Sequence, residues 1–155
     1  MSGRIEARLT ELGIELPQPG APIANYVPFT IAGTLVFISG QISQWNGELR
    51  HVGKLGGGIS MEDGQHAARL CGLNILAHLK VACGGDLDRV TRCVRLGGFV
   101  NCTPNFTAMP QIINGASDLM VDVLGDAGKH ARAAVGVSSL PGGVAAEVEA
   151  TFEIA

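Results

Sequence analysis

A strict alternation of residue types near the C-terminus constrains the fold of this chain more than any other feature. From Val144 to Ile154 every second residue is apolar, and the residues between them include three glutamates and a threonine. A period of two predicts a β-strand with one buried and one solvated face. The chain therefore needs a core on one side of a sheet.

A second strand is expected just before it. The turn sequence Leu140-Pro141-Gly142-Gly143 favours a tight reversal, so the sequence predicts a C-terminal hairpin. In the first strand Val135 and Val137 face one way. Arg132 faces the other way, above the small residues Ala134, Gly136 and Ser138. An arginine above such a floor leaves room for a ligand.

The rest of the chain alternates strands and helices. We expect a short helix over 1–13, then an extended connector marked by Pro17, Pro19 and Pro22, and then strands over 27–32 and 35–41. A helix capped by Ser60 should follow and end at Gly84-Gly85. After it we expect a strand over 90–102 with a bulge at Gly97-Gly98, and a helix from Thr103-Pro104 to Gly125. This order indicates a single α+β domain: one mixed sheet with two helices on one face.

The composition limits the class of protein. The chain has 155 residues, of which 46% are hydrophobic and 16% charged, with a mean hydropathy of +0.29. The apolar excess indicates either a subunit interface or a dense core. No apolar run approaches the roughly 18 residues that a membrane span needs.

Partners and cofactors are restricted in the same way. A net charge of −3 without a Lys/Arg cluster argues against nucleic-acid binding. The four cysteines and four histidines lack metal-ligand spacing, so we expect no metal. Reduced cysteines and an N-terminus without a leader pattern favour a cytoplasmic protein.

Several residues are candidates for chemistry. Arg132 has the geometry to hold a carboxylate bidentately, although a salt bridge is the alternative. Glu147 and Glu149 share one strand face, which is more often simply solvated. Tyr26 is the only tyrosine and could equally be a packing residue. Ser39 and Gly40 end a buried strand and could offer a hydroxyl and a backbone N–H.

Two segments resemble the RidA family, also called YjgF-like or L-PSP endoribonuclease-like. The first is Tyr26 followed by AGTLVFISGQI at 32–42. The second is HARAAV at 130–135, followed by Ser138-x-Leu140-Pro141 and Val148-Glu149-Ala150. The resemblance covers residues 26–155 as a core, with 1–25 as a lead-in segment.

This resemblance implies a chorismate-mutase-like fold assembled as a homotrimer, with a central barrel and clefts between subunits. It further implies hydrolytic deamination of reactive enamines or imines, such as 2-aminoacrylate or 2-iminopropionate, without a cofactor. Arg132 would hold the substrate carboxylate and Glu147 would orient water. Tyr26, Ser39, Gly40 and Ala133 would line the site.

The chain also departs from the family pattern. Ala133 and Ala134 replace a common serine and cysteine, His130 replaces a proline or alanine, and Pro110 stands near a ligand-contacting asparagine. These departures favour an alternative, a trimeric binder of small carboxylate metabolites that does not turn them over. Endoribonuclease activity is a third hypothesis, which the acidic chain and the lack of a histidine pair disfavour.

Overall fold

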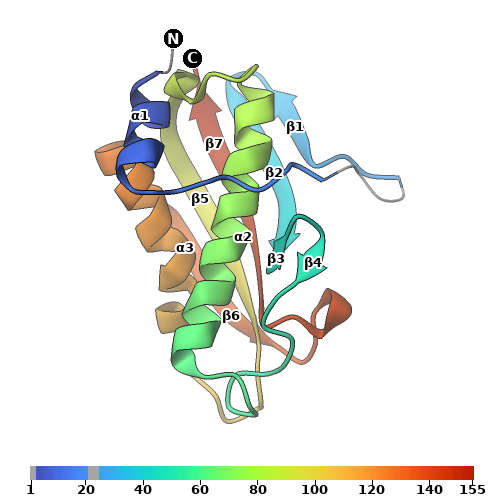
Figure 1. The fold of residues 1–155 in the computed structure, drawn as a ribbon. Helices are drawn as coiled ribbons and strands as arrows, with labels where there is room; N and C mark the ends of the chain where they lie inside the picture. The colour runs from blue at the N-terminus through green and yellow to red at the C-terminus, as the bar shows by residue number, and fades with distance from the viewer. Residues whose placement is uncertain (1–2, 21–24) are drawn as a thin grey trace.

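Three α-helices lie on one face of a mixed five-stranded sheet in the computed structural model, which describes residues 3–20 and 25–155 (Figure 1). Along the sheet the strand order is β1-β2-β7-β5-β6. The strands are β1 (Phe29–Ala32), β2 (Leu35–Ile42), β5 (Val90–Asn101), β6 (Ala131–Val137) and β7 (Ala146–Ile154). The helices are α1 (Arg4–Glu11), α2 (Met61–Ala82) and α3 (Met109–Leu124), and a small ribbon is formed by β3 (Gln44–Trp45) and β4 (Glu48–Leu49).

The C-terminal strand β7 is the centre of the sheet, as its alternation predicts. It pairs antiparallel with β2 on one side and with β5 on the other. Its apolar residues Ala146, Val148, Ala150, Phe152 and Ile154 are buried under the helices, whereas Glu149 is exposed on the opposite face. The predicted mixed α+β sheet is therefore confirmed.

Helix α2 begins where the sequence predicts. The Ser60 side chain caps it by accepting a hydrogen bond from the Asp63 backbone N–H at 3.1 Å. The helix lies very close to α3, because a Cβ on Gly115 of α3 would overlap the carbonyl oxygen of Gln65 on α2. Glycine at this crossing thus allows the two helices to touch backbone to backbone.

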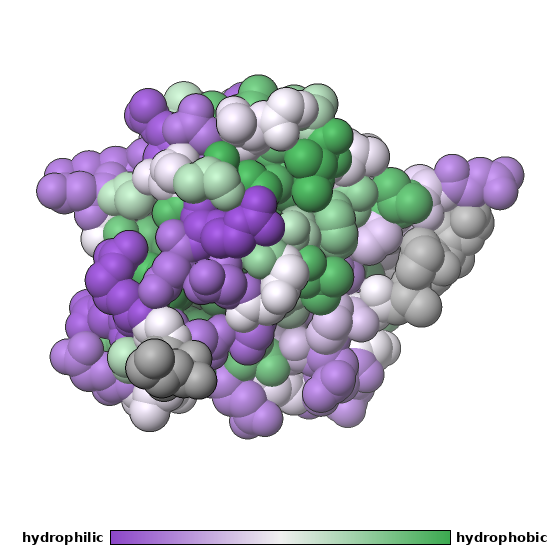
Figure 2. Space-filling view, turned by 90° about the horizontal axis from the view of Figure 1, so that it is seen from above, coloured by the Kyte–Doolittle hydropathy of each residue, from purple (hydrophilic) through white to green (hydrophobic). Residues whose placement is uncertain are grey.

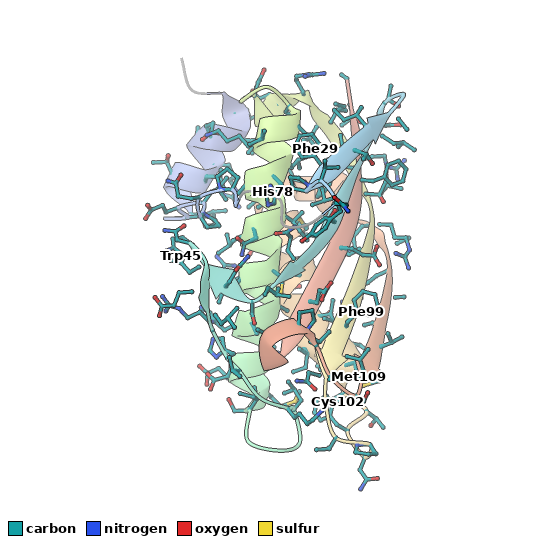
Figure 3. All side chains as sticks on the ribbon, turned by 90° about the vertical axis from the view of Figure 1, so that its right-hand side faces the viewer. Phe29, Trp45, His78, Phe99, Cys102 and Met109 are labelled. Atoms are coloured by element: carbon teal, nitrogen blue, oxygen red, sulfur yellow. The ribbon has the colours of Figure 1, made fainter. Side chains whose placement is uncertain are left out.

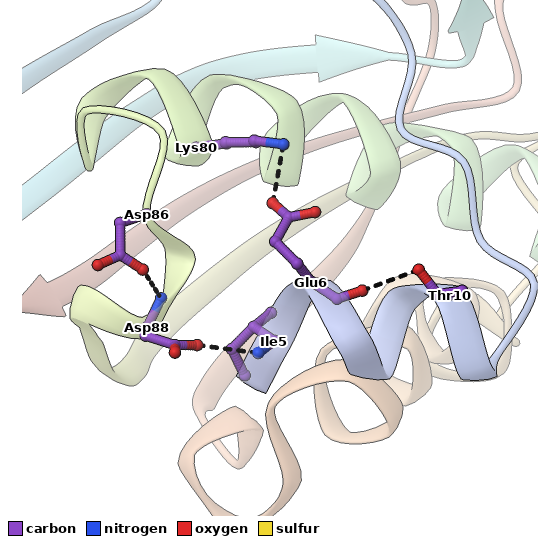
Figure 4. A network of polar contacts seen from close by, with 6 residues as sticks. All are labelled: Ile5, Glu6, Thr10, Lys80, Asp86 and Asp88. Carbon is purple, nitrogen blue, oxygen red and sulfur yellow. Dashed lines mark hydrogen bonds and ion pairs between the residues drawn. The ribbon is translucent and has the colours of Figure 1, made fainter. Parts of the chain in front are cut away.

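The number of helices differs from the expected two. Helix α1 lies beside α3 (Figure 1), and its Ile5 and Leu9 are each only 3% exposed within the same core cluster. Asp88 accepts hydrogen bonds from the Arg4 and Ile5 backbone N–H groups at 2.8 Å, and these bonds hold the helix start in place. Figure 4 shows the bond to Ile5. The prediction of a helix over 1–13 is confirmed, but its packing makes it the third helix of the layer. Of the predicted connector, Pro17 and Pro19 follow α1, and Pro22 lies outside the described residues.

The predicted C-terminal hairpin is wrong. Strands β6 and β7 do not pair with each other, because β5 lies between them, parallel to β6 and antiparallel to β7. The Leu140–Gly143 segment contains a short 3-10 helix (η3, Pro141–Gly143) on a connection that crosses the end of β5. Alternation determines which face of a strand is buried, but it does not determine the strand's neighbours.

The start of α3 and the role of Gly97-Gly98 in β5 also differ from expectation. Helix α3 begins at Met109 with Pro110 in its first turn, five residues beyond the predicted first helical residue Pro104, because Thr103 instead forms a turn in which its carbonyl accepts from the Phe106 N–H. The pair Gly97-Gly98 is not a bulge, since β5 keeps its register there and shifts only between Val90 and Arg95. Gly98 is instead required by close packing, because a Cβ would lie 2.6 Å from Ile113.

The described surface carries apolar as well as polar side chains. Figure 2, seen from the end where the termini lie, shows apolar residues exposed between polar patches. None of the helices in the described ranges is both long enough and apolar enough to cross a membrane. Cys71, Cys83 and Cys93 are buried free thiols, as predicted, but Cys102 is only partly buried.

Asn101, at the end of β5, connects three chain segments through hydrogen bonds. Its side-chain NH₂ donates to the carbonyl oxygens of Val144 at 3.1 Å and Gly53 at 3.3 Å, and its Oδ1 accepts from Lys54 Nζ at 2.7 Å. Its backbone N–H also donates to the Ala145 carbonyl. The Asn101 residue is 3% exposed, and its amide supplies the hydrogen bonds that several buried backbone groups would otherwise make with water.

We predict that Asn101→Ala lowers the free energy of unfolding by about 2 kcal/mol, because it leaves buried carbonyl groups and Lys54 without a partner. Urea denaturation followed by circular dichroism measures the loss. Asn105→Ala, at an exposed position on the following loop, is the matched control and should stay within about 0.5 kcal/mol of wild type. Equal stabilities for the two variants would contradict the role of Asn101.

Candidate functional site

A pocket of about 510 Å³ lies where β2 extends beyond its neighbour β1. Strand β1 pairs with β2 only as far as Ile38, and the Ser39 N–H then donates to the Pro28 carbonyl at 2.9 Å, so the pairing of the two segments ends at the pocket. Four of the predicted site residues line the pocket: Tyr26, Ser39, Gly40 and Glu147. The structure therefore brings together residues that are up to 121 positions apart in sequence.

A bulge in β2 shapes the pocket wall. The register between β2 and β7 shifts between Ile38 and Gln41, so Ser39 and Gly40 form the irregular step. The Glu147 carboxylate lies directly against Gly40, and a Cβ on Gly40 would overlap its Oε2 atom. Because Gly40 has no side chain, the Glu147 carboxylate occupies the space where a side chain at position 40 would lie.

Glu147 is electrostatically unusual. Burial raises the pKa of its carboxyl group, and the negative charge of Glu149 on the same strand face raises it further. A half-buried carboxyl whose pKa lies above its ordinary value can exchange a proton with a ligand more readily near neutral pH. Glu147 is thus the strongest acid–base candidate in the pocket.

His78 is a pocket residue that the sequence reasoning missed. It lies on α2 at the level of Phe29 (Figure 3), lines the pocket, and is only 6% exposed. Burial lowers the pKa of its imidazole, which favours the neutral form. The signal was present in the sequence, because His78 follows Ile75 by three residues and so belongs to the inner stripe of α2.

Tyr26 and Ser39 contribute differently. Tyr26 is 54% exposed at the mouth of the pocket, so it is not the packing residue considered as its alternative. The Ser39 hydroxyl donates to the Val27 carbonyl at 2.7 Å, which fixes the segment leading into β1. The Ser39 hydrogen is therefore already used, and its oxygen remains as an acceptor.

Arg132 does not reach this pocket within one chain. It lies on the edge strand β6, separated from β7 by β5, and its side chain points toward α3. Glu147 lies on the opposite face of the sheet, since its neighbours Ala146 and Val148 are buried under the helices. Ala133 is exposed on β6, also away from the pocket. The two predicted catalytic residues are thus on different faces and different sides of the sheet.

The Arg132 guanidinium is fixed by α3. Its Nη1 donates to Asn114 Oδ1 at 2.7 Å and to Ser117 Oγ at 3.1 Å. Ser117 Oγ also lies 2.8 Å from His130 Nε2. Among the described residues, Nε and Nη2 have no hydrogen-bond or ion-pair partner, so this edge of the guanidinium can pair with a carboxylate. Sequence reasoning missed Asn114 and Ser117 because the contact joins a helix to a strand.

Metal ligation has little support in the described part of the chain. No group of three or more His, Cys, Asp or Glu side chains there has a suitable arrangement. The nearest approach to one is His51 and His66, whose Nε2 and Nδ1 atoms lie 2.7 Å apart. Two ring nitrogens at this distance share a hydrogen bond, so the expected lack of a histidine pair is wrong.

Comparison with known proteins gives one family. Residues 6–146 match the family model described as "YjgF/chorismate_mutase-like, putative endoribonuclease". A Trypanosoma cruzi protein, TCP17, is 45% identical over 154 residues, which cover 99% of this chain and 96% of that protein.

Solved structures agree with this match. Atu1372 from Agrobacterium tumefaciens, a protein of unknown function, has 46% identity and a TM-score of 0.90, covering 97% of this chain and 93% of its own. A "putative endoribonuclease" from Shewanella oneidensis has 35% identity and a TM-score of 0.93, covering 98% and 100%. Escherichia coli TdcF with bound serine is more distant, at 25% identity and a TM-score of 0.63, covering 90% and 94%.

The burial of Glu147 predicts an effect on stability. Because its pKa is raised in the folded protein, the folded state holds the proton more tightly than the unfolded chain does. This contribution to stability is present at low pH and is lost as the pH rises through the folded-state pKa. Glu147→Gln should therefore raise the melting temperature at about pH 8 and leave it unchanged at about pH 4.

Differential scanning calorimetry at both pH values measures this effect. Glu153→Gln is a control on the same strand and the same face. A Glu147→Gln variant that is less stable than wild type at the higher pH would show that the buried carboxylate is stabilised rather than strained.

Proposed function

The chain belongs to the YjgF/chorismate mutase-like family, the broad family that contains the RidA proteins, and from this premise we propose that it hydrolyses small 2-imino or enamine acids to 2-keto acids and ammonia. The observation that carries the proposal is the Glu147 carboxyl group, half-buried against Gly40 in a pocket of about 510 Å³, with its pKa raised. A group of this kind can activate water next to a small electrophile.

The reaction balances without a cofactor. Protonated 2-iminopropionate and water give pyruvate and ammonium. Glu147 removes a proton from water while the water oxygen bonds to the imine carbon, which gives a carbinolamine. The proton then passes from Glu147 to the nitrogen. The carbon–nitrogen bond breaks as Glu147 takes the hydroxyl proton, and the leaving ammonia accepts that proton from Glu147 and departs as ammonium. The raised pKa suits both steps, since the same group must accept a proton and then donate it.

Arg132 would hold the substrate carboxylate through its unpaired Nε/Nη2 edge. A bidentate pair of this kind fixes both the position and the orientation of the substrate. Since Arg132 and Glu147 lie on opposite faces of one sheet, they can act on the same substrate only if they come from different subunits. We therefore propose a homotrimer in which the β6 edge of one subunit lies against the pocket of the next.

A distant relative supports a ligand of this size. The structure of E. coli TdcF contains bound serine, a small amino acid with a carboxylate. A 2-imino acid has the same carboxylate next to a nitrogen-bearing carbon, so it presents similar groups to a similar fold. This supports the substrate class.

Binding without turnover is the alternative that a specific observation favours. Ala133 and Ala134 give β6 no side chain that reacts, so Arg132 and its α3 partners could retain a carboxylate metabolite without acting on it. Ligand-dependent thermal stabilisation without product formation would identify this function. Ribonuclease activity follows only from the family's name, and a cleavage assay on purified protein free of nuclease would test it.

We predict that Arg132→Ala and Glu147→Ala each lower kcat/KM on freshly generated 2-iminopropionate by roughly 100-fold. The first loses two charge-assisted hydrogen bonds to the carboxylate, and the second loses the base. Release of pyruvate, corrected for spontaneous hydrolysis, is the measurement. Glu153→Gln serves as the control and should retain activity. An Arg132→Ala enzyme within about twofold of wild type would refute the site assignment.

A mixing experiment tests the shared site. Arg132→Ala and Glu147→Ala subunits, co-refolded in equal amounts, should regain about a quarter of wild-type activity, because one site in four then receives an intact arginine from one subunit and an intact glutamate from its neighbour. Light scattering confirms the oligomeric state. If the mixture is trimeric and remains as inactive as its parents, the two residues do not meet across an interface.

A further inference from the structure

The hydrogen bonds around Arg132 form a chain that ends on a titratable group. Arg132 Nη1 donates to Asn114 Oδ1 and to Ser117 Oγ, which uses both of its hydrogens. Ser117 Oγ contacts His130 Nε2 at 2.8 Å, and His130 Nδ1 contacts the Gly128 carbonyl at 2.6 Å. The arginine is thus connected to an imidazole through a single hydroxyl.

The chemistry of the end groups fixes the tautomer. A carbonyl oxygen only accepts hydrogen bonds, so His130 Nδ1 must carry a hydrogen whatever the pH. In neutral His130 the Nε2 atom is therefore bare, and the Ser117 hydroxyl donates to it while accepting from Arg132. In protonated His130 both ring nitrogens donate, so Ser117 Oγ accepts hydrogen bonds from both His130 and Arg132. The Ser117 hydroxyl hydrogen then no longer donates to His130.

A bound carboxylate changes the balance between these two states. Without it, the positive charge of Arg132 opposes a second positive charge on His130. A carboxylate on the Nε/Nη2 edge neutralises the arginine and so removes much of that opposition. Binding of the anion then favours the protonated imidazole, and protonation must strengthen anion binding by the same factor.

We propose that Asn114, Ser117 and His130 position the Arg132 guanidinium for carboxylate binding and couple that binding to uptake of a proton by His130. This inference rests on the proposed role of Arg132 as the carboxylate anchor. Asn114 and Ser117 are positioning residues, because they hold Nη1 and leave the other edge for the ligand. His130 makes the affinity for the anion depend on pH.

Other charges near His130 do not provide the same link. Arg132 alone among the charged groups is connected to its ring by the hydrogen bonds found in the described residues. Asp126 and Lys129, on its own segment, pair with each other at 3.2 Å. The remaining charged residues on the elements around it are Asp118 and Asp122 on α3, Arg4, Glu6, Arg8 and Glu11 on α1, and Arg92 and Arg95 on β5.

Calorimetry with pyruvate, a stable 2-keto acid, tests the coupling. Titrations at about pH 6.5 in two buffers of different ionisation enthalpy give the number of protons taken up on binding. Wild type should take up a fraction of a proton and bind roughly 3- to 10-fold more tightly at about pH 5.5 than at about pH 8.

Variants separate this inference from the proposed function. In a Glu147→Gln background, which removes the other titratable group of the proposed site, His130→Gln should abolish the proton uptake, Ser117→Ala should reduce it, and His66→Gln, a histidine at a distant site, should leave it unchanged. If Arg132→Ala abolishes pyruvate binding while wild type shows no proton uptake, the coupling is wrong and the anchor stands. If pyruvate binding does not depend on Arg132, the anchor and the coupling both fail.

Discussion

The covering of only one face of the sheet is the constraint on which the other features depend. Strand β7 buries Phe152 and its apolar companions under α2 and α3, and it must therefore present its glutamates on the opposite face. The burial of the core is the strongest energetic term in the fold, and it therefore fixes the face of β7 on which Glu147 lies. Its position does not rely on a loop, so the carboxylate is as rigid as the sheet.

The candidate site combines this rigid strand with two irregularities. The bulge at Ser39-Gly40 removes a side chain where the Glu147 carboxylate needs space, and the early end of β1 leaves the wall of β2 open. Each feature alone is a local defect in a sheet. Together they give a pocket in which an acid is partly desolvated, which is the condition that shifts its proton affinity.

Local patterns in the sequence predict much of the fold and part of the site. The alternation in β7, the Ser60 cap and the Gly125 end of α3 all act within a few residues, so the sequence reveals them. Motif resemblance adds four residues of the pocket. The placement of β5 between β6 and β7 depends instead on pairing between distant strands, which no local period encodes. Asn101 was missed for the same reason, because its partners lie far away in sequence. Asn114 and Ser117 were missed because their contact joins a helix to a strand, and His78 was missed although its place on the inner stripe of α2 could be predicted.

The opposite placement of Arg132 and Glu147 has a consequence for how the protein responds to dilution. An isolated subunit would carry every reactive group and yet possess no assembled catalytic centre. In the proposed homotrimer, the number of complete centres would fall roughly with the third power of the subunit concentration below the concentration at which subunits associate. Catalytic activity would then be undetectable at low concentrations of the chain and would rise steeply once the subunits assemble. The activity would therefore not be proportional to the amount of chain.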